Sequence, residues 1–385
     1  MSYLLDSVSH IELRLISSVA EIQPDLEPLL SASNPFTQWH FLQALESSGV
    51  VHRSKGWQPL HFAFYDNEKL IAFIPHYIKS HSYGEFVFDW AWAEAYHRHG
   101  LDYYPKSLTG IPLSPVTGPR FFFSENVAPE VKQQLIHSII DFINEQTLSS
   151  WHINFLSAKE NLFFDTEHFI KRFDIQFHWH NQNYQSFEDF LASLKQKKRK
   201  NILRERRIVA QEGWTFESLS GHQMNQQLWT LFFKMYQKTF DKKGNWAQLN
   251  LQFFLYLSEH MPDNILLIFA CKNGEKLAGA LFLHSQSHLY GRYWGAIEES
   301  PGLHFETCYY QGIDYAIKQG LECFEPGAQG EHKLARGFLP RKTYSYHYIK
   351  DKRFAKAIGQ SVSLEADYHQ QSLDYYAKHS PYKKD

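Results

Sequence analysis

The chain has 385 residues, a formal net charge of −2 and 16% aromatic residues. This length exceeds one ordinary domain of about 100–200 residues, so two domains of similar size are predicted. The absence of a basic excess excludes a protein that binds nucleic acid over its whole surface. Three widely spaced cysteines favour a reducing compartment. With no signal-peptide pattern and no apolar run of about 20 residues, a cytoplasmic protein without a transmembrane segment is expected.

The first half of the chain, residues 1–180, is predicted to form one α/β domain. Its helix near Asn34 is indicated by a capping residue followed by Pro35 at the first helical position. Residues 107–117 are rich in Pro and Gly and should be irregular or lie at a sheet edge. The other predicted elements, in chain order, are strands at 10–15, 61–65 and 70–74, a helix at 131–143 and a strand at 151–156.

The second half, residues 181–360, repeats the order of helix, strand pair, helix and strand, and a polar tail at 361–385 follows. The turn at 272–274 is a hairpin signal, and Gly320 is the expected end of a helix. The predicted elements are helices at 187–210 and 229–240, strands at 265–271, 276–284 and 289–296, a helix at 304–318, and strands at 321–325 and 343–349.

Three stretches carry a family resemblance: Ser80–Lys106, Ser114–Arg120 and Tyr290–Phe338. The longest reads YGRYWGAIEESPGLHFETCYYQGIDYAIKQGLECFEPGAQGEHKLARGF. On these motifs the chain is identified as a member of the FemAB-like family of predicted N-acyltransferases, within the GNAT superfamily. The resemblance covers about residues 34–350. It implies an α/β fold with mixed sheets, arranged as two tandem GNAT-like domains.

The resemblance also implies a chemistry. FemAB relatives transfer an aminoacyl group from aminoacyl-tRNA to an amine of a peptidoglycan precursor, whereas other GNAT enzymes transfer acetyl from acetyl-CoA. Either reaction is acyl transfer to nitrogen. A small-molecule or peptide acceptor that bears a phosphate or carboxylate is therefore expected, with aminoacyl-tRNA or acyl-CoA as the donor.

One segment departs from the usual GNAT pattern. In that pattern a Gln/Arg-x-x-Gly-x-Gly/Ala loop cradles pyrophosphate with backbone N–H groups at a helix N-terminus. The equivalent residues here, Ala296–Leu303, contain one glycine, a proline without an N–H group, and the acids Glu298 and Glu299. Because paired carboxylates are poor neighbours for a pyrophosphate, CoA is disfavoured at this position and no cofactor is firmly implied.

The catalytic candidates lie in and near the loop from Glu325 to Arg336. N-acyl transfer needs a proton acceptor for the amine and a donor for the developing oxyanion. FemAB relatives carry a lysine shortly before a Gly-Phe pair, and here Lys333 and Arg336 precede Gly337-Phe338. Either could stabilise the oxyanion or hold an anionic donor, while Glu325 or His304 would accept the proton. Gln329 and His332 are predicted to bind substrate.

Further substrate-binding candidates lie on a predicted strand and in the first half. Arg292 and Trp294 should share one face of a strand and could hold an anion beside a ring. A dense run of aromatic, acidic and basic residues in the first half should line a substrate groove, with Lys106 or Arg98 facing an anionic group; an aromatic-packed connector is the alternative. The candidates in this run are Asp89, Trp92, Glu94, His97, Arg98, Tyr103 and Lys106.

The segment Lys195–Arg207 is strongly basic. Eight of its thirteen residues are Lys or Arg, and its one acid is Glu205. Such a helix could bind tRNA, a pyrophosphate-bearing precursor or an anionic membrane surface, and a solvated helix face is the alternative. FemAB relatives carry a similar basic run before the second half. The predicted polyanion-binding residues are Lys197, Lys198, Arg199, Lys200 and Arg204.

Two other classes of protein compete with the acyltransferase. A non-catalytic binding protein for a cell-wall precursor or RNA would keep the groove and the basic helix but need no proton acceptor. A metal enzyme would use the spacing His97-x-His99, which places both rings on one face of an extended segment; no cysteine or second histidine pair completes a typical site, so no metal is predicted. Nucleophile elbows, Walker loops and dinucleotide fingerprints do not occur in the sequence.

Overall fold

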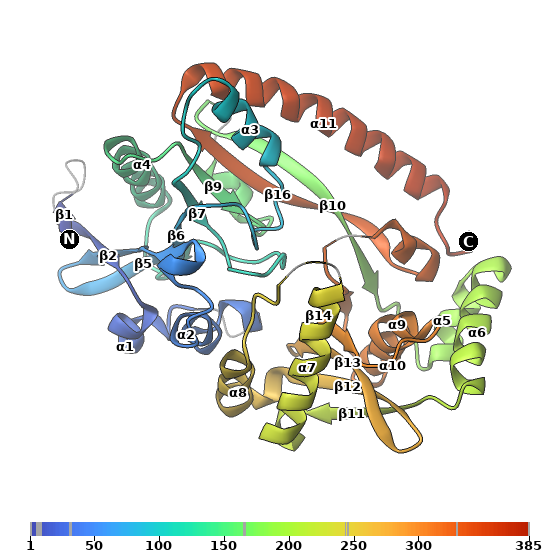
Figure 1. Ribbon diagram of the computed structural model, residues 1–385. Helices are drawn as coiled ribbons and strands as arrows, with labels where there is room; N and C mark the ends of the chain where they lie inside the picture. The colour runs from blue at the N-terminus through green and yellow to red at the C-terminus, as the bar shows by residue number, and fades with distance from the viewer. Residues whose placement is uncertain are drawn as a thin grey trace. The chain divides into compact units, whose positions relative to one another are not determined.

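The computed structural model describes residues 2–4, 10–30, 33–164, 167–242, 244, 246–328 and 330–383. Its contacts divide the chain into two compact units, Met1–Asp174 with Lys342–Gln370, and Ile175–Arg341 with Gln371–Asp385. The chain passes from one unit to the other within strand β10 (Ile170–His180), strand β16 (Leu339–Ile349) and helix α11 (Lys352–Lys378) (Figure 1). The predicted domain 181–360 therefore differs from the second unit, because residues 342–360 fold with the first.

The first unit contains two sheets. One is antiparallel, in the order β1-β2-β4-β5-β8, and the other runs β16-β9-β7-β6-β3. In the second sheet β7 and β9 are parallel and the other pairs are antiparallel. The strands are β1 (Ser2–Leu4), β2 (Ile11–Ile16), β3 (Trp57–Pro59), β4 (His61–Asp66), β5 (Lys69–Ile74), β6 (His76–Lys79), β7 (Lys106–Thr109), β8 (Phe122–Phe123) and β9 (Ser150–Asn154).

Helix α4 (Pro129–Glu145) supplies much of the first unit's core. Its buried residues Leu135, Ile139 and Ile143 recur at helical spacing, and they pack in one cluster with Phe62 and Trp151 of the sheets. Pro129 at the first turn suits a helix start, because that position needs no N–H donor. The other helices are α1 (Gln23–Leu26), α2 (Trp39–Ser47) and α3 (Trp90–Arg98).

The second unit is built on one mixed sheet in the order β11-β12-β13-β14-β15-β10. Only the β14–β15 pair is parallel. The strands are β11 (Thr215–Ser220), β12 (Ile265–Lys272), β13 (Glu275–His284), β14 (His288–Ala296) and β15 (Cys323–Glu325). The helices are α5 (Phe187–Ser193), α6 (Gln196–Gln211), α7 (Gln226–Lys242), α8 (Leu251–His260), α9 (Leu303–Phe305) and α10 (Gln311–Lys318).

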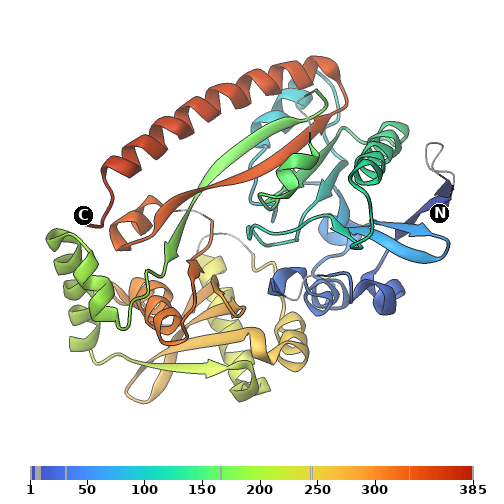
Figure 2. The same cartoon turned by 180° about the vertical axis from the view of Figure 1, so that it is seen from behind.

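Helices pack on both faces of this sheet, and two glycines allow their close approach. A Cβ at Gly295 of β14 would lie 2.2 Å from the backbone of Met235 in α7. On the other face, a Cβ at Gly312 of α10 would lie 2.7 Å from the ring of Phe324 in β15. Alternate residues of β15 and β10, Phe324, Phe177 and Trp179, enter the apolar core with α10. The back view shows α10 (orange) beside these strands (Figure 2).

Each unit thus contains one parallel strand pair joined through a helix. In the first unit the pair is β7 and β9, with α4 in the connection, and in the second it is β14 and β15, with α10. Parallel pairs need such a crossover connection. This shared arrangement confirms the predicted α/β class with mixed sheets.

Several predicted elements are confirmed, and five need correction. The strands at 61–65, 70–74, 265–271, 276–284 and 289–296 and the 272–274 hairpin are present. The helix expected from Asn34 is a 3-10 helix, Pro35–Thr37, and α2 begins only at Trp39, after the extended backbone of Gln38. The predicted helix 187–210 is broken at Leu194, which has extended backbone. The predicted helix 304–318 contains a π-helical turn, Glu306–Tyr310. Ser107–Thr109 is an interior strand rather than an edge, and the segment containing His97 is helical.

Within the residues that the structure describes, no helix combines the length and the apolar character that crossing a bilayer demands.

Candidate functional site

The parallel pair β14–β15 opens at its carboxyl end. The two strands are in register from His288 with Cys323 to Tyr290 with Glu325, where the pairing stops. β14 continues to Ala296, whereas the chain leaves β15 through Pro326. In α/β proteins, ligands bind beyond the carboxyl ends of such strands. Glu325 therefore lies where a substrate could enter the sheet.

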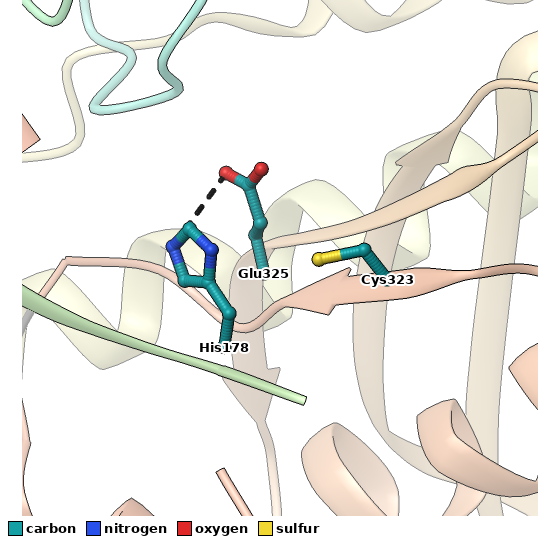
Figure 3. Close-up of side chains that lie close together, drawn as sticks. All are labelled: His178, Cys323 and Glu325. Atoms are coloured by element: carbon teal, nitrogen blue, oxygen red, sulfur yellow. Dashed lines mark ion pairs between the residues drawn. The ribbon is translucent and has the colours of Figure 1, made fainter. Parts of the chain in front are cut away.

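Glu325 shares its side of the sheet with Cys323 and His178. Cys323 lies two residues earlier on β15, and β10 runs antiparallel beside it, with Trp179 opposite Phe324. Oε2 of Glu325 lies 4.0 Å from Nε2 of His178, and one ligand-type atom from each of the three residues lies within 4.8 Å of the others. Figure 3 shows the three side chains converging.

Burial sets the protonation of this group. It raises the pKa of Glu325 to about 8, although Arg292 opposes that shift. It lowers the pKa of His178 to about 3, and the nearby His180 and Arg341 add to the effect. The amide oxygen of Gln176 lies 3.1 Å from Nε2 of His178 and orients the ring. At neutral pH the imidazole is uncharged and the carboxyl group is mostly protonated.

Lys333 brings a second titratable group to this part of the unit. It lies in the 3-10 helix η8 (Glu331–Arg336), is 2% exposed, and donates from Nζ to the carbonyl of Gly327 at 2.8 Å. Burial lowers the pKa of Lys333 to about 7; Cys308 opposes the shift and Arg292 adds to it. Lys333 also acts electrostatically on His178. The amine therefore exchanges a proton readily near neutral pH.

Arg336, the other predicted cation, is held by protein groups. Its Nη2 donates to Oε1 of Glu205 at 2.9 Å, and its Nη1 donates to the carbonyl of His332 at 2.9 Å. Its guanidinium lies 3.5 Å from the centre of the Phe305 ring. Arg336 therefore connects η8 to helix α6, and Lys333 is the better candidate for contact with a substrate.

His304, the other predicted proton acceptor, lies apart from this arrangement. It is exposed, and its ring packs edge-on against Trp294 at a centroid distance of 5.4 Å. His332 is also exposed, and its Nε2 lies 3.0 Å from the hydroxyl of Tyr309. Gln329 lies outside the described residues. Arg292 acts electrostatically on both Glu325 and Lys333, whereas the ring of His304 contacts Trp294, Phe305 and Tyr309.

The prediction that Arg292 and Trp294 share a face is wrong. A bulge in the β13–β14 pairing places Tyr293 opposite Leu281 and Gly291 opposite Phe282, so Arg292 is left out of the register. Arg292 interacts electrostatically with Glu325, whereas Trp294 packs against His304. An inserted residue breaks the period of two on which the prediction depended.

The turn after β14 is closed by its own contacts. The N–H groups of Ile297 and Glu298 both donate to the carbonyl of Leu277, at 2.7 and 3.4 Å. The carboxylate of Glu298 binds Lys272 at 2.8 Å, and Glu299 pairs with Lys242. These N–H groups are therefore engaged within the protein, and carboxylates line the turn.

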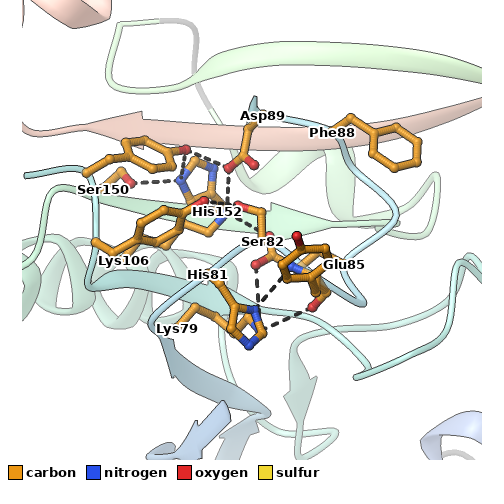
Figure 4. Close-up of polar contacts among 12 residues, drawn as sticks. Lys79, His81, Ser82, Glu85, Phe88, Asp89, Lys106, Ser150 and His152 are labelled. Atoms are coloured by element: carbon orange, nitrogen blue, oxygen red, sulfur yellow. Dashed lines mark hydrogen bonds and ion pairs between the residues drawn. The ribbon is translucent and has the colours of Figure 1, made fainter. Parts of the chain in front are cut away.

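In the first unit, the predicted groove residues Asp89, Tyr103 and Lys106 form a buried ionic cluster (Figure 4). The ammonium of Lys106 donates to Glu85 at 2.8 Å and to Asp89, and the hydroxyl of Tyr103 donates to Asp89 at 2.6 Å. Burial alone would raise the pKa of Asp89, but its interactions with Lys106 and His152 outweigh that effect and lower the pKa to about 2. Lys106 does not face an open groove, because two carboxylates already surround it.

The other first-half candidates lie on or beside helix α3. Glu94 and Arg98 are exposed and form an ion pair at 2.8 Å one turn apart. Trp92 is buried, with its ring edge-on to His347 at 4.9 Å. The expectation that His97 and His99 project from one face of an extended segment is wrong, because residues two apart on a helix diverge by about 200°.

Sequence reasoning missed four residues of these two groups. Lys79 and Glu85 belong to the first-unit cluster, and His152 lies 3.2 Å from Tyr103. Lys79 and His152 lie on strands β6 and β9, which come together only in the folded sheet, and Glu85 lies in the loop after β6. His178 had a local signal, because Phe177 and Trp179 alternate with it as buried aromatic residues of one strand.

His178, Cys323 and Glu325 are the described residues best placed to hold a metal ion. Imidazole, thiolate and carboxylate are all ligands of zinc. However, His178 lies in the field of His180, Arg341 and Lys333, and Glu325 in that of Arg292. These positive groups oppose a dication, so the geometry favours proton transfer over metal binding.

Comparisons with solved structures bear on the fold. The chain resembles FemX at 12% identity and a TM-score of 0.52, over 90% of this chain and 99% of that one. It resembles the C-terminal domain of a putative lysylphosphatidylglycerol synthetase from Agrobacterium fabrum at 10% identity and a TM-score of 0.51, over 89% and 95%. A tandem GNAT protein from the clavulanic acid pathway matches at 8% identity and 0.43, over 89% and 99%. No curated protein sequence matches.

Each of the two units contains a parallel strand pair that is connected through a helix, and together they define a protein with tandem GNAT-like domains. The chain belongs to the FemAB-like family, whose model is described as peptidoglycan biosynthesis/recognition and matches residues 17–384.

Proposed function

We propose that the protein transfers an aminoacyl or acyl group to an amine of an acceptor that bears a phosphate or carboxylate, such as a peptidoglycan-related precursor. The observation that carries this proposal is Glu325, a buried carboxyl group with a pKa of about 8 at the carboxyl end of a parallel strand pair. A general base is most effective when its pKa lies near the working pH. FemAB-like membership supports the same class of reaction.

In the proposed reaction Glu325 takes a proton from the acceptor's ammonium group. The neutral amine then attacks the carbonyl carbon of the donor, so a C–N bond forms and a tetrahedral oxyanion develops. Charged Lys333 stabilises this oxyanion. When the intermediate collapses, the bond from the carbonyl carbon to the donor's leaving oxygen or sulfur breaks, and the proton held by Glu325 passes to that leaving atom. The regenerated carboxylate of Glu325 then takes the second proton from the nitrogen, which leaves a neutral amide, and releases that proton to solvent.

Aminoacyl-tRNA is the favoured donor, and acyl-CoA is the alternative. In the turn that cradles CoA pyrophosphate in other GNAT enzymes, the N–H groups of Ile297 and Glu298 here bond to the carbonyl of Leu277, and Glu298 and Glu299 add carboxylates. A pyrophosphate would meet carboxylates instead of free donors. A cytoplasmic location agrees with the three free cysteines.

A transfer assay with labelled aminoacyl-tRNA and a UDP-linked peptide acceptor tests the proposal. Glu325→Gln keeps the shape of the side chain but removes the base, so the turnover number should fall by about 10²–10⁴-fold. Glu322→Gln, at an exposed position three residues away, is the matched control and should leave turnover unchanged. Equal turnover in the two variants would refute the role of Glu325. Retention of both compounds without product, in wild type, would favour the binding-protein alternative.

A further inference from the structure

Helix α6 has a sharply divided surface. Ile202 and Val209 are buried, and they define the inner face. Lys197, Lys200, Arg204 and Arg207 are exposed and follow one another at intervals of three or four residues. Residues at this spacing lie on one side of a helix. At about 1.5 Å per residue, the four cations form a line about 15 Å long.

The charges on the inner face are paired, and those on the outer face are not. Glu205, the one acid of the helix, binds Arg336 at 2.9 Å and accepts a hydrogen bond from Tyr310. Arg206 pairs with Glu306 at 3.2 Å. Within the part of the chain that the structure describes, none of the four outer cations forms an ion pair. The helix therefore directs its only carboxylate inward and presents cations outward.

Two large apolar side chains flank this line. Leu203 is 43% exposed and Ile208 is 38% exposed. With about 100° per residue, Leu203 falls on one side of the line of cations and Ile208 on the other. Phosphate binding alone requires no apolar flank, whereas a helix lying at a lipid surface uses both cations and apolar side chains. Both figures of the fold place α6 at the edge of its unit.

We propose that the outer face of α6 docks on an anionic lipid bilayer. The four cations would lie against the lipid phosphates, and Leu203 and Ile208 would enter the headgroup boundary. Each cation near such a surface strengthens partitioning by about fivefold at moderate ionic strength. Because a helix is about 10–12 Å across, docking would hold Glu205 and the attached Arg336 on the side away from the lipid. This surface does not depend on the proposed transfer reaction.

Vesicle sedimentation tests the proposal with the intact chain. The probes are vesicles of phosphatidylglycerol and phosphatidylcholine in equal parts, and vesicles of phosphatidylcholine alone. Wild type should bind the anionic vesicles, and 0.5 M salt should release it. The fourfold variant Lys197→Ala, Lys200→Ala, Arg204→Ala and Arg207→Ala should bind at least about 100-fold more weakly. A control with the same charge change at exposed lysines elsewhere, Lys234→Ala, Lys352→Ala, Lys356→Ala and Lys378→Ala, should bind as wild type does.

A second variant separates lipid from RNA. Leu203→Ser with Ile208→Ser keeps every charge, so vesicle binding should weaken about tenfold while any tRNA binding persists. Thermal unfolding of each variant checks that the chain stays folded. Equal loss of binding in the fourfold variant and its control would overturn the proposal. So would binding to tRNA with no binding to anionic vesicles, which would assign this face to RNA.

Discussion

The two units use buried charge in opposite ways. In the first, Lys106 donates hydrogen bonds to both Glu85 and Asp89; the pKa of Asp89 is lowered to about 2, while burial raises that of Glu85 to about 7. In the second, no described cation donates a hydrogen bond to Glu325, and burial raises its pKa to about 8. Paired buried charges stabilise a fold, whereas an unpaired one is poised to exchange a proton. On this difference in pairing we propose a structural role for the first cluster and a chemical role for the second.

The largest effect on stability is expected from breaking the first cluster. Lys106→Met leaves Glu85 and Asp89 buried without their main cation, so the free energy of unfolding should fall by about 3–5 kcal/mol. Urea denaturation measures this value. Lys159→Met, at an exposed lysine of the same unit, is the control and should change it by less than about 0.5 kcal/mol. A Lys106→Met protein as stable as the control would show that the cluster does not support the fold.

The next prediction distinguishes the roles of Lys333 and Arg336, the two cations of η8. Lys333→Ala should reduce turnover by about 10²–10³-fold with little change in the Michaelis constant, because it removes an oxyanion donor. Arg336→Ala should instead lower the free energy of unfolding by about 1–3 kcal/mol, because Glu205 loses its partner. Steady-state kinetics and urea denaturation of both variants give the comparison. If Arg336→Ala lost turnover without losing stability, the two roles would be exchanged.

The third effect concerns how the stability of the fold depends on pH. Glu325 has a folded pKa of about 8, above its ordinary value of 4.5. Such a group stabilises the fold fully below the ordinary value, and this contribution is lost as pH rises toward 8. Wild type should therefore lose stability relative to Glu325→Gln between these limits, by at most about 1.4 kcal/mol per pH unit. Parallel denaturation curves at pH 5 and pH 8 measure the change. A constant difference would mean that Glu325 titrates normally.

Local patterns predicted much of the fold. Strands β12 and β13 could be predicted from the sequence, because two apolar runs flank Asn273-Gly274, a turn pair that favours a hairpin. The sequence could not predict that residues 342–370 fold with the first unit. It follows from the pairing of β16 with β9, nearly 200 residues apart in the chain, and no local periodicity reports such a contact.

The site was predicted in part for the same reason. Glu325 and Lys333 lie in one loop region after a strand, where ligand sites are common. Their partner His178 comes from another strand, and its position depends on register. Lys106 was misread because a lysine beside aromatic residues looks like a binding group, and only the fold shows Glu85 and Asp89 around it.

The pH dependence of turnover tests the central claim most directly. With saturating donor and acceptor, wild-type turnover should rise tenfold per pH unit below about pH 7 as Glu325 loses its proton. It should stay level between about pH 7 and pH 8 and fall at higher pH, because Lys333 has then lost its charge. Glu325→Gln should lose this rise and stay low across the range, while Glu322→Gln should reproduce the wild-type curve. A Glu325→Gln protein that keeps both the turnover and the rise below about pH 7 would contradict the assignment of Glu325 as the general base.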